Sequence, residues 1–134
     1  MANAMYSKGK EKILSAGINW VTDLLKAVLI KNTYAQNLVT DEFHSTISSY
    51  VLNSAKTITS PSVTAGVFDA DNVTFQAVTA GDTVEAVVIY KDTTVSGTSP
   101  LLLYIDNITG FPLATNGGDI TIQWDNGAFK IFSL

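Results

Sequence analysis

The sequence has no cysteine and no arginine, and its 134 residues include only one histidine and three prolines. Without cysteine the chain cannot form disulfides, use thiolate catalysis, or hold an iron–sulfur cluster or a cysteine-ligated zinc ion. Without arginine it lacks the planar two-pronged donor that proteins use to hold phosphate, guanine or carboxylate groups. We therefore expect its stability to come from core packing and sheet hydrogen bonds.

Charge is also scarce. Only 15% of the residues are charged, against about 25% in an average domain, and the net charge is −4 from twelve acidic residues and eight lysines. A nucleic-acid-binding protein needs a basic face that displaces counterions from phosphates. Only Lys8, Lys10 and Lys12 lie close together, in a pattern typical of a solvated helix face. We expect no nucleic-acid partner.

Long apolar runs are missing as well. The longest strongly apolar runs, Ala86–Tyr90 and Leu101–Ile105, have five residues each, whereas a membrane-spanning helix needs about 20. The first residues do not show the charged region followed by an apolar region that marks a secretory signal. We therefore expect no membrane partner.

The residues that are present favour β-structure. Apolar residues make up 46% of the chain, and Val, Ile and Thr together number 39, which is the composition that pleated, half-buried surfaces favour. The length is typical of one domain. We expect residues 1–134 to form a single domain, in which residues 1–20 are a helical arm or docking segment and residues 21–134 a β-rich body.

The N-terminal part of the chain has the only helical patterns. Residues 7–16 predict a short helix that ends at Gly17, since glycine commonly follows the last helical turn. Residues 24–30 are mostly apolar at both alternating sets of positions, which predicts a strand covered on both faces, with a helical segment as the alternative. Thr40 followed by two acidic residues predicts the start of another short helix, with Phe43 and Ile47 on its buried side.

After residue 49 the pattern is one of short strands and turns. The segment 83–91 is the most apolar and is expected at the centre of a sheet. The spacing predicts a mainly β fold: an antiparallel β-sandwich or jelly-roll-like barrel preceded by a short N-terminal helical segment. The expected strands span residues 50–59, 63–68, 73–77, 83–91 and 101–106.

The C-terminal segment carries a hairpin signal. Ile120, Ile122 and Trp124 alternate with polar residues, Asn126-Gly127 follows, and residues 129–132 run back. Asparagine followed by glycine is typical of a two-residue turn, because both residues tolerate positive φ. We therefore expect residues 120–124 and 129–132 to pair with each other.

No catalytic or ligand-binding motif stands out. His44 follows Asp41 and Glu42, but one histidine and two adjacent acids on a short helix do not converge on a metal ion. Residues 69–72 resemble the start of a calcium loop, yet Thr74 and Ala80 occupy the positions that need glycine and an acid. We expect no catalytic residue, no metal and no cofactor.

Four aromatic residues lie in the less regular N-terminal third, and large aromatic side chains are enriched at protein interfaces. Core packing is the more common role for such residues and stays open for each of them. The candidates for a partner interface are Tyr6, Trp20, Tyr34 and Phe43.

Two long stretches resemble one family. The segments 66–92 (GVFDADNVTFQAVTAGDTVEAVVIYKD) and 116–132 (NGGDITIQWDNGAFKIF), together with 22–30 (TDLLKAVLI), resemble small virion structural proteins of tailed bacteriophages. Within that group the chain is most similar to capsid decoration, or cement, proteins. The resemblance implies a non-enzymatic protein, often trimeric, that binds the major capsid protein lattice. It implies location on the capsid surface of the virion, after residence in the host cytoplasm before assembly.

Other functions stay open at this stage. A neck, tail or fibre-associated component of the same particle would have similar sequence features. A carbohydrate-binding β-sandwich is a further alternative, because tryptophan and tyrosine faces stack on sugars. Residues 1–20 could also reach an adjacent subunit, and we expect a homo-oligomer, with a trimer as one form.

Overall fold

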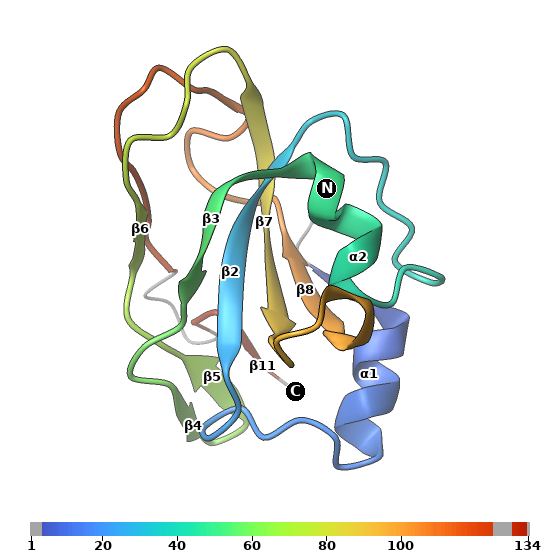
Figure 1. The fold of residues 1–134 in the computed structure, drawn as a ribbon. Helices are drawn as coiled ribbons and strands as arrows, with labels where there is room; N and C mark the ends of the chain where they lie inside the picture. Colours follow the sequence, from blue (N-terminus) through green and yellow to red (C-terminus); the bar gives the residue numbers. More distant parts are fainter. Residues whose placement is uncertain (1–3, 125–129, 134) are drawn as a thin grey trace.

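The structure, a computed structural model, describes residues 4–124 and 130–133, and its centre is an antiparallel sheet. Within the described ranges this sheet has the strand order β1-β8-β7-β2-β3, and β9 pairs with the start of β7. Figure 1 shows β2, β7 and β8 side by side in the middle of the molecule. The strands are β1 (Ala4–Met5), β2 (Leu25–Lys31), β3 (Val51–Thr57), β7 (Thr83–Lys91), β8 (Leu101–Ile105) and β9 (Leu113–Ala114).

A second layer of short strands covers one face of the central sheet and lies on the left in Figure 1. It consists of a two-stranded and a three-stranded antiparallel sheet in the described part of the chain. The resulting arrangement is sandwich-like rather than a closed barrel. The strands are β4 (Ser62–Thr64), β5 (Val67–Asp69), β6 (Val73–Phe75), β10 (Ile120–Ile122) and β11 (Phe132–Ser133).

The opposite face of the central sheet is covered by helices and loops, on the right in Figure 1. The longest helix, α1, begins directly after β1 and contacts β8. The other helical elements are one turn each. They are α1 (Ser7–Leu14), α2 (His44–Ile47) and the 3₁₀ helices η1 (Ser48–Tyr50) and η2 (Ser96–Thr98).

Alternation along β2 and β7 divides the buried residues into two cores, one on each face of the sheet. In β2, Leu25, Ala27 and Leu29 face the strand layer, whereas Val28 and Ile30 face the helical side. Both sets are apolar because both faces are covered, which is the property that predicted this strand. The mainly β fold with a short N-terminal helix is therefore confirmed, as is the central position of β7.

Two local predictions were wrong. The expected strand over residues 63–68 is the hairpin β4–β5, because Ala65 and Gly66 adopt left-handed conformations with φ of 51° and 78° and reverse the chain. The expected cap at Thr40 is not formed. Its backbone N–H bonds to the side chain of Asn37, and α2 begins only at His44.

The predicted C-terminal hairpin lies only partly within the described residues. The Asn126-Gly127 turn lies outside the described residues. The described strands on either side of it pair elsewhere: β10 pairs with β6, and β11 pairs with β5. The alternation of Ile120 and Ile122 into the core is as predicted, since both are buried and Thr121 is exposed.

The N-terminal segment does not extend away from the β-rich body as an arm. Ala4 and Met5 pair with Tyr104 and Leu103, so that β1 forms one edge of the central sheet. The connection to β2 is held to β7 by Lys91, whose ammonium group donates to the Gly17 carbonyl at 3.0 Å. Residues 4–17 therefore belong to the same folded unit as the strands.

Candidate functional site

The N-terminal helix α1 buries a glycine, and not a large apolar side chain, against the sheet. The buried residue of α1 is Gly9, and a Cβ at this position would lie 2.6 Å from the Leu101 carbonyl oxygen and 3.1 Å from the Leu102 Cα. The helix backbone therefore lies directly on β8, an approach that only glycine allows. Because Gly9 occupies the contact with the sheet, the large apolar side chains of the helix are displaced toward its outer side.

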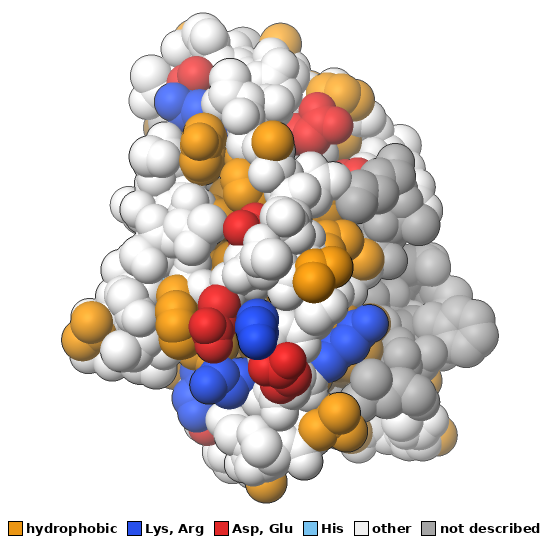
Figure 2. Space-filling view, turned by 90° about the vertical axis from the view of Figure 1, so that its right-hand side faces the viewer, with side chains coloured by type: hydrophobic (Ala, Val, Ile, Leu, Met, Phe, Trp, Pro, Cys, Tyr) orange, Lys and Arg blue, Asp and Glu red, His pale blue; other side chains and the backbone are white. Residues whose placement is uncertain are grey.

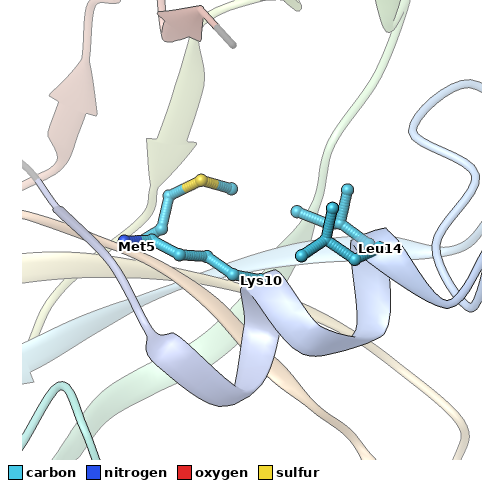
Figure 3. A pocket seen from close by; sticks show the side chains of 4 residues that line it. Met5, Lys10 and Leu14 are labelled. Carbon is cyan, nitrogen blue, oxygen red and sulfur yellow. The ribbon is translucent and has the colours of Figure 1, made fainter.

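Those apolar side chains border an open hollow of about 180 Å³ between β1 and α1. Its lining consists of Met5, Lys10, Ile13 and Leu14. Leu14 is 87% exposed, the highest value among the exposed large hydrophobic residues described. Figure 3 shows the Met5 and Leu14 side chains standing above the same side of the helix, with the Lys10 chain running toward Met5. The hollow is thus apolar, open to solvent, and bordered by one cationic side chain.

The helix also carries a concentration of positive charge. Lys8 pairs with Glu11 across one helical turn at 3.3 Å, an exposed pair of small energetic value. The ammonium group of Lys12 lies 6.0 Å from the centre of the Phe43 ring, within reach of a cation–π contact. Lys10 has no ion-pair partner among the described residues. In Figure 2, which faces this side of the molecule, lysine and acidic side chains lie side by side in the lower half, with apolar patches around them.

Two of the four aromatic residues proposed for an interface are buried within the chain. Tyr6 is 0% and Tyr34 6% exposed. Their hydroxyl groups lie 3.0 Å apart, and the Tyr34 hydroxyl donates to Asp41 at 2.5 Å. Burial raises the pKa of both tyrosines above the ordinary value. Of the two roles considered for these residues, core packing is the one seen in this chain.

The other two candidates are half-buried and lie at separate places. The Trp20 ring packs against Phe68 and Phe132, with centroids 5.0 and 4.7 Å away, beside a hollow of about 80 Å³. Phe43 forms an isolated antiparallel β-bridge with Pro100, and its ring lies near the ammonium group of Lys12 on α1. The structure therefore does not gather the four aromatic residues into one surface, and a partner contact at Trp20 or Phe43 stays a prediction.

Trp124 does not present a free ring face of the kind that stacks on sugars, whereas Trp20 is half-buried and lines an open hollow. Trp20 is flanked by two phenylalanine rings, and Trp124 is 8% exposed with its indole N–H donating to the Asp71 carbonyl at 2.8 Å. Among the described residues, the indole N–H of Trp20 has no hydrogen-bond partner. The burial and hydrogen bond of Trp124 give no support to sugar stacking on that residue.

His44 has a partner that sequence spacing did not indicate. Its Nδ1 lies 2.7 Å from the Ser96 hydroxyl, 52 residues along the chain, and its ring packs on Tyr90 at 4.6 Å. Burial lowers the pKa of His44, and the negative charge of Asp92 opposes this shift in part. Asp92 itself is paired with Lys26 at 2.8 Å, and that hydrogen bond lowers the pKa of the carboxyl group.

The two acids before His44 serve other contacts. Asp41 accepts hydrogen bonds from the Tyr34 hydroxyl and the Asn37 backbone N–H, and the Glu42 carbonyl accepts from the Leu101 N–H. Within residues 4–124 and 130–133, no group of three or more histidine or acidic side chains is arranged to hold a metal ion. In the same ranges, no helix has the length and apolar character needed to cross a membrane.

Sequence reasoning missed two features of this region. The Ser96–His44 contact joins residues far apart in the chain, so no local motif announces it. The hollow at α1 did have a signal, because the helix had a narrow apolar face and a glycine one turn before Ile13. No protein-family model matches the chain, and the search of curated proteins found no similar sequence.

Proposed function

We propose that this chain is a non-enzymatic structural protein of tailed-phage virions, which binds the outside of the capsid lattice and stabilises it. The observation that carries the proposal is the resemblance of segments 66–92 and 116–132 to small virion structural proteins. These segments supply β5, β6, β7 and β10, and therefore the central strand and much of the second layer.

The surface at α1 fits this role. Soluble proteins expose single apolar side chains without consequence, but an apolar hollow with a charged border is typical of an interaction site. Here Met5, Ile13 and Leu14 provide the apolar part and Lys10 the charge. The rigid attachment of α1 through Gly9 keeps this surface in one geometry, which lowers the entropy lost on binding.

The residues that resemble catalytic groups are engaged in structural contacts. His44 is held between Ser96 and Tyr90. Asp92, the carboxylate whose charge acts on His44, is bonded to Lys26. A hydrolytic triad requires the carboxylate to orient the histidine through a hydrogen bond, whereas the carboxylate here orients a lysine. This arrangement favours a structural interpretation of the cluster.

A decoration protein stabilises a shell by linkage. A ligand that binds the assembled lattice better than free subunits shifts the equilibrium toward assembly. Because a capsid repeats the same site many times, a protein that contacts several lattice subunits at once gains further through multivalency. Only surface complementarity and a stable fold are required of such a protein.

The test is co-sedimentation of the purified protein with empty capsids that lack it, with tails of the same phage in a parallel tube. We expect saturable binding to capsids at a fixed ratio to lattice units, and capsids that resist heating better once loaded. Binding to tails alone would overturn decoration in favour of a tail or neck component. Binding to neither would overturn both.

A further inference from the structure

The β4–β5 hairpin leaves one strand edge without a partner. In the described part of the chain, β4 is the end strand of the sheet β11-β5-β4, and its three residues are all exposed. Figure 1 shows β4 at the lower left, with β5 beside it. Val63, at the centre of β4, is 52% exposed. The edge of such a strand offers unpaired backbone N–H and C=O groups to an extended chain.

The strand register shows which backbone groups are free. The hairpin turn has two residues, Ala65-Gly66, so the residues on either side of it form the first hydrogen-bonded pair. In the next pair, Val63 and Phe68, the backbone groups point outward from the hairpin. On the Phe68 side they meet the C-terminal segment, since the Ile131 N–H donates to the Phe68 carbonyl at 3.1 Å. On the Val63 side the N–H and the C=O face the free edge.

Two hollows flank this edge, one on each face of the hairpin. Residues directly opposite each other in an antiparallel pair project to the same face. Val63 and Phe68 line an apolar hollow of about 80 Å³. The residues that project to the other face line a polar hollow of about 340 Å³. A strand added beside β4 would present its side chains to the two hollows alternately. The apolar hollow is completed by Trp20, Gly66 and Phe132, and the polar hollow is lined by Ser62, Thr64, Ala65, Val67, Asp69 and Lys130.

The edge strand β3 of the central sheet is protected, in contrast to β4. It carries Lys56, and its pairing with β2 is irregular around Asn53, whose φ is 62°. The Asn53 side chain also donates to the Gln76 carbonyl at 2.8 Å and so ties β3 to the segment after β6. Charged residues and irregularities of this kind hinder strand addition. The strand β4 has neither, and Pro61 before it confines the free groups to those of Val63.

We propose that β4 accepts an extended segment of a partner protein, which adds as a further strand and carries one aliphatic side chain between two uncharged polar ones. The residue opposite Val63 exchanges two main-chain hydrogen bonds with it, and its side chain enters the apolar hollow. Main-chain bonds thus hold the segment, and the two hollows select its side chains. This inference does not rest on the proposed capsid role.

The chemistry of the segment follows from the two hollows. A cavity of about 150 Å³ holds a benzene molecule, so the apolar hollow, of about 80 Å³, suits an aliphatic side chain better than an aromatic ring. The polar hollow is lined by one acidic residue, Asp69, and one basic residue, Lys130, and neither forms an ion pair with a described residue. A charged side chain would meet a like charge there, whereas an amide both donates and accepts.

Nuclear magnetic resonance of the isotopically labelled protein, titrated with short peptides, tests the contact. The probes are end-blocked peptides Thr-Asn-Xaa-Asn-Thr in which Xaa is valine, isoleucine, leucine, phenylalanine or glycine. We expect saturable shifts centred on residues 62–69 and the Trp20 indole N–H, with the aliphatic peptides binding about tenfold more tightly than the glycine peptide. N-methylation of the isoleucine removes the N–H that meets the Val63 carbonyl and should weaken binding by a similar factor.

Two variants of similar exposure separate this edge from the rest of the surface. Val63→Lys places a charge at the free edge and beside the apolar hollow, and it should raise the dissociation constant about tenfold or more. Val95→Lys changes a valine that is 55% exposed, directly before η2, and should leave binding unchanged. Circular dichroism and thermal unfolding establish that both variants are folded.

Three results overturn the proposal. The first is no binding by any aliphatic peptide at millimolar concentration, and the second is equal binding of the N-methylated and unmodified peptides. The third is equal binding by the Val63→Lys and Val95→Lys variants. Shifts at residues 62–64 that depend on protein concentration without peptide would identify a second copy as the occupant, which also overturns the proposed partner. None of these measurements involves capsids, so their failure leaves the co-sedimentation test unaffected.

Discussion

The two faces of the central sheet are covered in different ways. On one face the strands β5, β6 and β10 supply an almost wholly apolar core that includes Phe68, Phe75 and Ile122. On the other face the cover comes from α1, α2 and a long loop, and the core contains the tyrosines Tyr6, Tyr34, Tyr90 and Tyr104. The first face is stabilised mainly by packing, with the Trp124 indole N–H bonded to the Asp71 carbonyl, whereas the second also depends on buried hydroxyl groups finding partners.

The difference matters because a buried hydroxyl is costly without a hydrogen bond. Tyr6 and Tyr34 bond to each other, and Tyr34 also bonds to Asp41 in the loop before α2. Burial raises the pKa of Tyr104 to about 12. The helical face is thus held by specific pairs of residues, and we expect it to be the more sensitive to single-atom changes.

The largest effect is expected on the strand-covered face. Phe75 is 0% exposed on β6, and Phe75→Ala should lower the free energy of unfolding by about 3–5 kcal/mol through lost burial and the cavity that remains. Urea unfolding followed by tryptophan fluorescence measures the change. Gln76→Ala, at the exposed neighbour, should stay within about 0.5 kcal/mol. Similar losses for both would show that the second layer does not pack as described.

A smaller effect is expected where α1 meets the sheet. Gly9→Ala places a methyl group against the Leu101 carbonyl and should cost about 1–3 kcal/mol, because the backbone of β8 cannot yield as a side chain would. Gly97→Ala is the control, since a Cβ there meets no atom within 4 Å. Thermal unfolding of the two variants compares them. An unchanged midpoint for Gly9→Ala would contradict the close approach of helix and strand.

The hydrogen-bonded pair Tyr6 and Tyr34 allows a test in which a single hydroxyl group is removed. Tyr34→Phe removes the partner of the Tyr6 hydroxyl and one donor to Asp41, and it should cost about 1–3 kcal/mol. Tyr50→Phe is the control, because its ring contacts Tyr34 at 5.5 Å while its hydroxyl has no described partner. Equal stability of the two variants in urea would remove the argument that the helical face depends on buried hydrogen bonds.

The smallest effect is expected from pH. Burial lowers the pKa of His44 below its ordinary value of 6.5, so in the interval between the folded and unfolded pKa values the unfolded state binds the proton more readily. The stability linked to neutral His44 is therefore present above about pH 6.5 and is lost as pH falls through the folded pKa. Melting temperatures between pH 7.5 and 5.5 should decline more in the wild type than in His44→Gln. Parallel declines would contradict the role of His44.

The sequence predicted some elements of the molecule and missed others. The strand Thr83–Lys91 was predicted with its observed bounds, because a turn at residues 80–82 precedes it and residues 86–90 form an unbroken apolar run. The hairpin at Ala65-Gly66 was not, because alanine gives no signal of a left-handed conformation and Gly66, which does, was placed inside the expected strand 63–68. On the helical face, Tyr6 and Tyr34 were considered for a partner surface because irregular segments have no periodicity to indicate which side is buried.

The sequence by itself determined the mainly β class, the short N-terminal helix and the central strand, since these follow from local periodicity and composition. Only the tertiary structure decided that residues 4–17 belong to the sheet, that His44 meets Ser96, and that Leu14 stays exposed while Gly9 is buried. Each of these depends on contacts between distant parts of the chain. Such contacts arise from how closely two surfaces can approach, and a pattern of single residues does not encode that distance.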